Sequence, residues 1–389
     1  MPGIDRVAAP RPHAVHTTAQ PPPDWTAALS PADGFADPSW LAVFAGRAPD
    51  DRRWFTLRAA DGAIAAGVAG HLQHQPIEYA PLDPAVLSPA RSPFWPGRPQ
   101  DAPDTDRRSA ALALPCLWLV HPGLTSFVVG PRRHQLAEVS ALVAGVADWA
   151  WRQGARSLVW PYVSAPDTAL TSALEAAGFA PVPLTAEAWL PVPPDGWDGY
   201  LAALPAERRR DVRRERRRLA DAGARARIGD RADLARCAEL RAAQRRKYGQ
   251  LADADAELSR LVVLTELADH CLVVVDSTGS GRAAPVSFCL FCRLGPDWHA
   301  MSTGTDYGDP AGRFAYFEVC FYAAVEAAAA AGAQRIGYGH AATFAKRWRG
   351  CEVQVVTAWA RARDPGAQRA LVELGRDWEA AHARAERST

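Results

Sequence analysis

The feature that most constrains the fold is a pattern that occurs twice along the chain. Residues 147–163 and residues 325–341 each contain an Ala-rich amphipathic helix, a Gly-Ala ending and a short strand that ends in an aromatic residue. The matched pairs, all 178 residues apart, are Gly154 and Gly332, Leu158 and Ile336, and Trp160 and Tyr338. Because this offset is close to half of the 389 residues, the sequence predicts two tandem copies of one α/β unit.

The elements around each copy follow the same order. In the first half, residues 52–72 indicate a hairpin that turns at Asp61-Gly62, and residues 114–120 indicate a buried strand. A helix over 135–154, with Val139, Leu142, Val143 and Val146 on one face, precedes the repeated strand, and a second helix ends at Gly178. In the second half, residues 270–294 indicate two strands, 298–305 a third, and 314–332 one long helix. This order predicts an α+β fold with a mixed, mostly antiparallel sheet in each half.

Composition limits the classes of protein that need to be considered. The chain is 48% hydrophobic and 22% charged, with a net charge of +1, which is ordinary for a globular protein. The first residues lack the apolar core of a secretory signal, and no apolar run reaches the roughly 20 residues that a membrane span needs. We expect a disordered arm at 1–24, a first domain at 25–195 and a second at 196–389. Residues 76–103, rich in proline, indicate a long irregular loop of the kind that often binds ligands.

The seven cysteines are odd in number and scattered. Only Cys289 and Cys292 have the spacing of metal ligands, and a strand would place them on opposite faces. The pattern therefore predicts reduced core cysteines and no metal site, which is typical of a cytoplasmic protein.

Three segments of the second half resemble one family. Residues 200–223, 317–339 and 344–350 are similar to FemABX-type transferases, the peptidoglycan biosynthesis/recognition group of the GNAT acyltransferase superfamily. The resemblance covers about 195–362, whereas the first half shares only the general layout. It implies two tandem GNAT-like domains, each a mixed sheet flanked by helices, with the site in the second. It also implies an acyl- or aminoacyltransferase activity, and many of these relatives use aminoacyl-tRNA as donor.

The loop before the long helix departs from the GNAT pattern. Enzymes of that superfamily that use CoA carry a Q/R-x-x-G-x-G/A loop, whose N–H groups hold the pyrophosphate. Here residues 305–318 have Gly308 and Gly312 at a different spacing, and Pro310 removes a donor. The departure favours aminoacyl-tRNA over acyl-CoA as donor, with no bound cofactor, and acyl-CoA stays the alternative.

An Arg-rich helix is the strongest local concentration of charge. Eight of the eleven residues from 208 to 218 are Arg, and a narrow apolar seam ends with Val212 and Leu219. One interpretation is a solvated helix in a generally Arg-rich chain; the other is a surface that contacts the phosphates of tRNA. No DNA partner is expected. The candidates for tRNA contacts are Arg208, Arg209, Arg213, Arg214, Arg216 and Arg217.

The segment at 344–350 carries the main candidate for catalysis. The resemblance implies that Lys346 binds a donor phosphate or the carbonyl that is transferred. A positioned cation stabilises the oxyanion of acyl transfer, and Arg349 is suited to hold a phosphate. These cations could also belong to a solvated loop, but the neighbouring glycines and aromatic residues, Trp348 among them, favour a packed wall.

The remaining candidates are weaker. Asp306 and Glu318 are possible general bases, although each also suits the start of a helix. On the donor side we expect Trp348, Tyr338 and His340, and we expect a helix that carries Arg241 and Tyr248 to face the acceptor. No Ser/His/Asp or Cys/His arrangement predicts a covalent intermediate.

Three functions follow from these patterns. The first is transfer of an aminoacyl group from aminoacyl-tRNA to an amine or hydroxyl acceptor, either a peptidoglycan precursor or a natural-product intermediate. The second is an acyl-CoA-dependent N-acyltransferase, and the third is a non-catalytic GNAT-fold protein that binds RNA or a protein partner. A Lys between aromatic residues and glycines favours an enzyme over simple electrostatic binding.

Overall fold

The computed structural model divides the chain into two compact units. Unit 1 contains residues 1–30, 35–185 and 355–389, and unit 2 contains residues 31–34 and 186–354. The chain passes from unit 1 to unit 2 within strand β6 (Ala180–Pro191) and returns within strand β12 (Glu352–Ala362). The residues that the structure describes are 14–43, 51–77, 80–89, 92–96, 113–277, 284–340 and 342–387.

This division differs from the predicted domain boundary between 195 and 196. Residues 186–195 belong to unit 2, and residues 355–389, expected in the second domain, belong to unit 1. The reason is that β12 pairs with β5 (Ser157–Ser164) from Val356 onward. Leu371, in the helix that follows β12, also lies in the same hydrophobic cluster as Val182.

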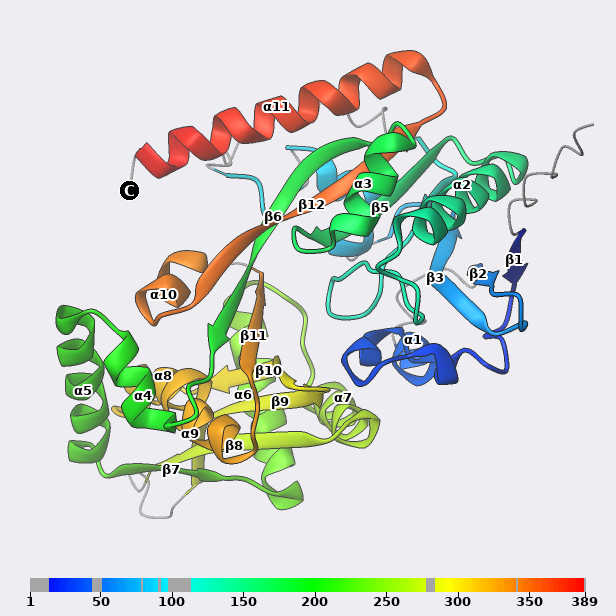
Figure 1. Ribbon diagram of the computed structural model, residues 1–389. Coiled ribbons are helices and arrows are strands. Elements are labelled where there is room, and N and C mark those ends of the chain that lie inside the picture. Colours follow the sequence, from blue (N-terminus) through cyan, green and yellow to red (C-terminus); the bar gives the residue numbers. More distant parts are fainter. Residues whose placement is uncertain are drawn as a thin grey trace, which may run out of the picture. The chain divides into compact units, whose positions relative to one another are not determined.

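Unit 1 is built on a mixed sheet with the strand order β1-β2-β3-β4-β5-β12. Only β4 and β5 are parallel in this series; the other neighbours are antiparallel. The predicted stripe of α2, from Val139 to Val146, is fully buried against the sheet. Besides parts of β6 and β12, the elements are β1 (Val15–Thr18), η1 (Thr26–Ala28), α1 (Pro38–Val43), β2 (Arg52–Arg58), β3 (Ile64–Gln73), η4 (Ala80–Leu82), η5 (Pro84–Leu87), β4 (Cys116–Trp118), α2 (Leu136–Arg152), β5, α3 (Thr168–Ala176) and α11 (Pro365–Arg387) (Figure 1).

Two predictions about irregular segments agree with the structure only in part. Residues 15–18 of the expected disordered arm form β1, which pairs with β2, so that prediction is wrong there. Residues 1–13 lie outside the described residues. Within the expected loop at 76–103, the described part forms η4 and η5 and buries Val86 and Leu87. The apolar side chains of a proline-rich segment are therefore used for packing.

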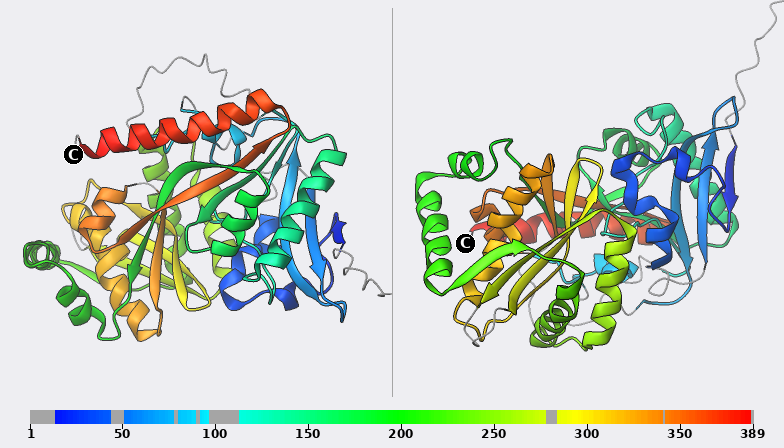
Figure 2. Two further views of the ribbon diagram at one scale, coloured as in Figure 1. Left: turned by 45° about the horizontal axis from the view of Figure 1, so that its top comes forward. Right: turned by 90° about the horizontal axis from the view of Figure 1, so that it is seen from below.

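Unit 2 has the strand order β6-β11-β10-β9-β8-β7, with β10 and β11 parallel and the other neighbours antiparallel. Helices α6 and α7 cover the face of β9 that carries Cys292, whereas α8 and the helical residues after it cover the face that carries Cys289 (Figure 2). The elements are η2 (Pro31–Ala36, in part), α4 (Gly196–Ala203), α5 (Ala206–Asp221), β7 (Ala224–Ile228), η7 (Arg231–Asp233), α6 (Leu234–Lys247), α7 (Ala254–Leu267), β8 (His270–Ser277), β9 (Ala284–Leu294), β10 (Asp297–Thr305), α8 (Gly312–Phe317), η8 (Glu318–Tyr322), α9 (Ala323–Ala330), β11 (Arg335–His340) and α10 (Thr343–Trp348).

The register of the two sheets confirms the internal repeat. In unit 1, Leu158 pairs in parallel with Leu117 of β4. In unit 2, Ile336, which is 178 residues after Leu158, pairs in parallel with Trp298 of β10. Both Leu158 and Ile336 are completely buried, and in each unit a helical crossover joins the two parallel strands. The shared sequence pattern therefore marks equivalent positions.

The predicted single helix at 314–332 is interrupted in the structure. A π-helical turn, η8, separates α8 from α9, and all five of its residues are buried. A π turn inserts an extra residue into the helix. Its five residues point in different directions and are buried because α5 covers one side and the sheet covers the other. The helical period of the sequence does not show this insertion.

The seven cysteines are free thiols, and all but Cys271 are buried, as predicted for core cysteines. Over the described part of the chain, none of the helices has the length and apolar character that crossing a membrane requires.

Candidate functional site

Lys346 fills an irregularity at the end of β11. Pairing of β11 with β10 stops at Gly337, and its register with β6 shifts between Gly337 and His340. Gly339 adopts a left-handed conformation (φ +60°) at this point. The Nζ of Lys346 donates to the carbonyls of Tyr338 (2.8 Å), Gly339 (3.1 Å) and His340 (3.1 Å). The ammonium thus binds three successive carbonyls where the strand is irregular.

The charge of Lys346 is buried without a carboxylate partner among the described residues. The residue is 8% exposed, and burial lowers the pKa of its ammonium to about 8, so it remains charged at neutral pH. This placement fits a packed wall and not a solvated loop. All three ammonium protons are already donated, so a direct bond to an oxyanion would replace one of the carbonyls.

Arg349 is held by an ion pair that the sequence did not predict. Its guanidinium lies 3.2 Å from the ring centroid of Phe317 and donates to both carboxylate oxygens of Glu215 (3.2 Å each). Tyr322 donates its hydroxyl hydrogen bond to the same carboxylate, and the Tyr200 hydroxyl donates to the Arg349 carbonyl (3.1 Å). Arg349 is 5% exposed, so it joins α5, η8 and α10 and is not an open fork for phosphate.

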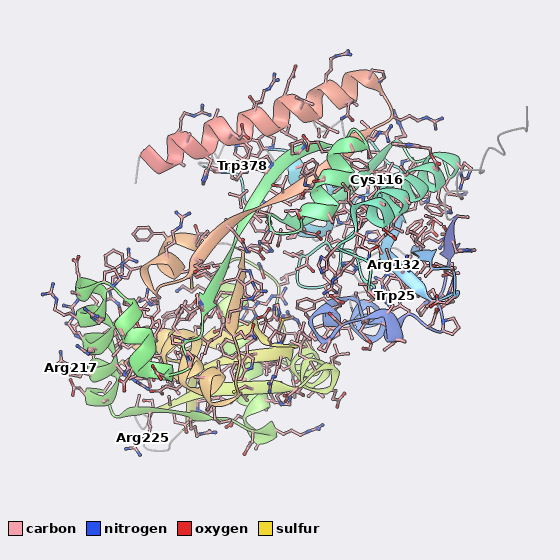
Figure 3. All side chains as sticks on the ribbon, viewed as in Figure 1. Trp25, Cys116, Arg132, Arg217, Arg225 and Trp378 are labelled. Carbon is pink, nitrogen blue, oxygen red and sulfur yellow. The ribbon has the colours of Figure 1, made fainter. Side chains whose placement is uncertain are left out.

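Helix α5 presents most of its arginines to solvent. It buries only Val212 and Leu219, so the narrow apolar seam docks as predicted. Arg213 and Arg217 are exposed, and Figure 3 shows Arg217 on the outward side of the helix. Arg214 pairs with Asp211 on the same helix (2.5 Å). The exposed side of α5 is therefore strongly cationic.

Arg208 connects this cationic face to α10. Its guanidinium lies 4.7 Å from the ring centroid of Trp348 and donates to the Arg347 carbonyl (2.9 Å). Trp348 stacks at 6.3 Å on Phe344, which is an exposed aromatic residue. Arg209, the next residue of α5, donates weakly to the Ala202 carbonyl (3.4 Å). Guanidinium groups and aromatic rings thus lie next to one another on one surface of unit 2.

Arg216 and Glu318 face each other inside unit 2. Glu318 is 2% exposed, and its Oε1 accepts a hydrogen bond from Arg216 Nε (3.1 Å). Arg216 also donates to both oxygens of Glu326 (2.9 and 2.7 Å) and lies 4.2 Å from the Trp197 ring centroid. Burial raises the pKa of Glu318 to about 7, against the opposing effect of Arg216. Among the six arginines proposed to contact tRNA, Arg216 is the one held by Glu318 and Glu326. Glu318, a candidate general base, contacts Arg216 and not Lys346.

The loop before α8 uses its own carboxylates to bind its N–H groups. Asp306 Oδ1 accepts from the Gly308 N–H (2.9 Å), and Asp309 Oδ1 accepts from the Ala311 N–H (2.8 Å). A Cβ on Gly312 would lie 1.9 Å from the Asp306 carbonyl oxygen, so this position requires glycine. Asp306 therefore stabilises a turn of the loop and does not cap α8, which begins at Gly312. The N–H groups of Gly308 and Ala311 are engaged where CoA-using enzymes hold pyrophosphate.

The aromatic candidates occupy two different environments. The Tyr338 hydroxyl donates to the Cys320 carbonyl (2.5 Å), and its ring stacks on Phe321 at 4.5 Å, so Tyr338 is part of the wall beside Lys346. Burial raises its pKa well above the ordinary value. Tyr248 is 67% exposed at the end of α6, where Lys247 lies 6.0 Å from its ring centroid.

The last two candidates also differ in their surroundings. His340 contributes its carbonyl to Lys346, and its side chain is half-buried. Arg241 of α6 donates to the Thr303 carbonyl of β10 (3.2 Å), so it ties that helix to the sheet. The structure therefore groups Lys346, Tyr338, His340 and Arg349, and places Arg241, Tyr248, Asp306 and Glu318 elsewhere in unit 2.

Comparisons with known proteins were made by family and by structure. A family model described as FemAB-like, peptidoglycan biosynthesis/recognition, matches residues 125–387. The crystal structure of FemX matches with a TM-score of 0.53 at 13% identity, covering 80% of this chain and 88% of that one. A conserved protein of unknown function from Bacteroides thetaiotaomicron VPI-5482 matches with a TM-score of 0.51 at 10% identity, covering 85% and 91%. No curated protein matches the sequence. At these identities the structural likeness establishes the fold, and the predicted α+β, tandem GNAT-like fold is confirmed.

Proposed function

This chain belongs to the FemAB-like family of peptidoglycan biosynthesis and recognition proteins, and from that premise we propose that it transfers an aminoacyl group from aminoacyl-tRNA to an amine or hydroxyl acceptor. The acceptor class is a peptidoglycan precursor or a natural-product intermediate. The family supports the reaction type, because FemABX-type proteins include transferases that take their aminoacyl group from tRNA.

The observation that carries the choice of donor is the surface formed by α5 and α10. Arg213 and Arg217 are exposed on α5, and Arg208 lies over Trp348, which stacks on Phe344. Guanidinium groups neutralise phosphates, and exposed aromatic rings stack on unpaired bases. Such a surface suits the single-stranded acceptor end of a tRNA better than a compact cofactor.

The loop before α8 supports the same choice. An acyl-CoA donor needs free N–H groups near its pyrophosphate. In unit 2 the N–H groups of Gly308 and Ala311 are bound by Asp306 and Asp309, whose charges also repel phosphate. This geometry disfavours acyl-CoA at that position.

In the proposed reaction, the acceptor nitrogen or oxygen attacks the ester carbonyl of the aminoacyl-tRNA. The new C–N or C–O bond forms, and the ester bond to the terminal ribose breaks. The buried positive charge of Lys346 stabilises the oxyanion that develops between these steps. Asp306 lies 3.6 Å from Arg236, and Glu318 is hydrogen-bonded to Arg216, so both carboxylates are already engaged. We therefore propose that the proton lost by the acceptor passes to the leaving ribose oxygen.

The test of the donor uses two separate incubations of the purified protein, from which bound tRNA has been digested by ribonuclease and the ribonuclease then removed. One contains a labelled pool of aminoacyl-tRNA with amine acceptors, and the other contains labelled acyl-CoA with the same acceptors. We expect transfer only from the aminoacyl-tRNA. Saturable turnover of acyl-CoA without tRNA would overturn the proposal.

A binding experiment tests the surface independently of the acceptor. The affinity for tRNA should fall with salt, and Arg213→Ala or Arg217→Ala should reduce the slope of log K against log salt by about one unit per lost phosphate contact. The matched control is Arg376→Ala, an exposed arginine of α11. Equal slopes for the wild-type protein and the α5 variants would contradict a tRNA surface at this helix.

A further inference from the structure

A groove of about 450 Å³ lies in unit 2, apart from Lys346. Helix α5 forms one wall, η8 and α9 form the other, and β7 with Val273 of β8 forms the floor. The floor is apolar and includes Ala224, Ala226 and Val273. On the α9 wall, the small side chains of Ala323 and Ala327 leave space for a ligand. The groove can therefore hold a short apolar chain.

One end of the groove carries an excess of carboxylate. Glu318 and Glu326 both line it, and the guanidinium between them is that of Arg216. Arg225 and Arg227 line the groove from β7, where Arg227 is paired with both Asp233 and Asp276. Arg216 binds Oε1 of Glu318 and both oxygens of Glu326. When both glutamates are ionised, two negative charges stand against the one positive charge of Arg216.

The second oxygen of Glu318 has no partner within the described part of the chain. Among the described residues, Oε2 of Glu318 accepts no hydrogen bond, although the residue is 2% exposed. Leaving a buried acceptor unsatisfied costs about 1–3 kcal/mol, and more when the group is charged. A donor that enters the groove would remove this cost. No group of three possible metal ligands occurs in the described part of the chain, so the donor is not a metal ion held in that way.

We propose that this groove binds a primary ammonium group carried on a short apolar chain. The ammonium donates to Oε2 of Glu318 and neutralises the excess carboxylate, while the chain lies against the alanines of α9 and the floor of β7. A neutral chain lacks the positive charge that would balance the second carboxylate. The site does not depend on the proposed transfer reaction.

Binding is measured on the full-length protein without tRNA or acceptor. The probe is n-butylamine, which is an ammonium ion at neutral pH, and n-butanol is its neutral counterpart of similar length. Ligand-observed NMR with increasing probe concentration reports saturable binding. We expect n-butylamine to saturate and n-butanol to bind at least tenfold more weakly.

Two variants change the groove in different ways. Glu318→Gln keeps the size of the side chain and removes its charge, and Ala327→Leu fills the groove and keeps the charge. Each should weaken n-butylamine binding at least tenfold. The controls are Glu239→Gln, which removes an exposed carboxylate on α6, and Ala330→Leu, which adds the same bulk to the exposed side of α9. Both controls should bind as the wild-type protein does.

Circular dichroism confirms that each variant is folded, and Ala327→Leu keeps the test informative if Glu318→Gln does not fold. Absence of saturable n-butylamine binding would overturn the proposal. Equal binding of n-butanol, or unchanged affinity in both groove variants, would overturn it as well, because the groove would then recognise no charge or would not be the site.

Discussion

The burial of Lys346 predicts a specific dependence of stability on pH. The ordinary pKa of a lysine is 10.5, and burial lowers that of Lys346 to about 8 in the folded protein. Between these values the unfolded chain keeps a proton that the folded protein has lost, so the free energy of unfolding rises with pH. From pH 7 to pH 9.5 the gain is about 2 kcal/mol, because each unit of pKa difference is worth about 1.4 kcal/mol.

The perturbation that isolates this effect is Lys346→Met, which keeps a long flexible side chain and removes the charge. Urea denaturation of wild-type and variant protein at pH 7 and pH 9.5 gives the difference in unfolding free energy at each pH. The wild type should gain about 2 kcal/mol over the variant across this interval. Subtracting the variant removes the contribution of other groups that titrate in both proteins.

The chain offers an internal control, since its only two lysines are Lys247 and Lys346. Lysine labelled with ¹³C at Cε gives two signals, and the one that disappears in Lys346→Met should titrate near pH 8. Lys247→Met, at an exposed position, assigns the other lysine signal. The same pH dependence in Lys346→Met and the wild type would refute the reasoning that burial controls this ammonium.

Two further predictions concern the packing of unit 2. Glu215→Ala leaves the buried guanidinium of Arg349 without its carboxylate and should destabilise the protein by about 3–5 kcal/mol in urea denaturation, whereas Asp211→Ala, which breaks an exposed pair on the same helix, should cost less than about 1 kcal/mol. Similar losses for the two variants would contradict the buried pair. Gly312→Ala places a Cβ 1.9 Å from a main-chain oxygen and should lower stability by about 3 kcal/mol, whereas Gly308→Ala meets only a side-chain oxygen at 3.1 Å and should cost less. A neutral Gly312→Ala would show that the loop before α8 is looser than described.

Local patterns in the sequence determined much of the fold. The spacing of Val139, Leu142, Val143 and Val146 predicted the buried face of α2, and Gly62 marked the hairpin turn. These signals are readable because a helix repeats every 3.6 residues and a tight turn needs particular residues. The repeat at an offset of 178 residues marked equivalent strands in two units, because each copy must bury the same apolar positions.

Tertiary structure decided which charged residues meet. The sequence placed Glu215 beside arginines of its own helix, but its buried partner is Arg349, 134 positions later. Sequence resemblance singled out Lys346, yet only the irregular end of β11 shows that its ammonium binds three carbonyls. The sequence also did not predict the π turn at Glu318–Tyr322 or the pairing of β12 with β5. Periodicity describes neighbours three or four residues apart, whereas these contacts depend on where separate strands and helices lie after folding.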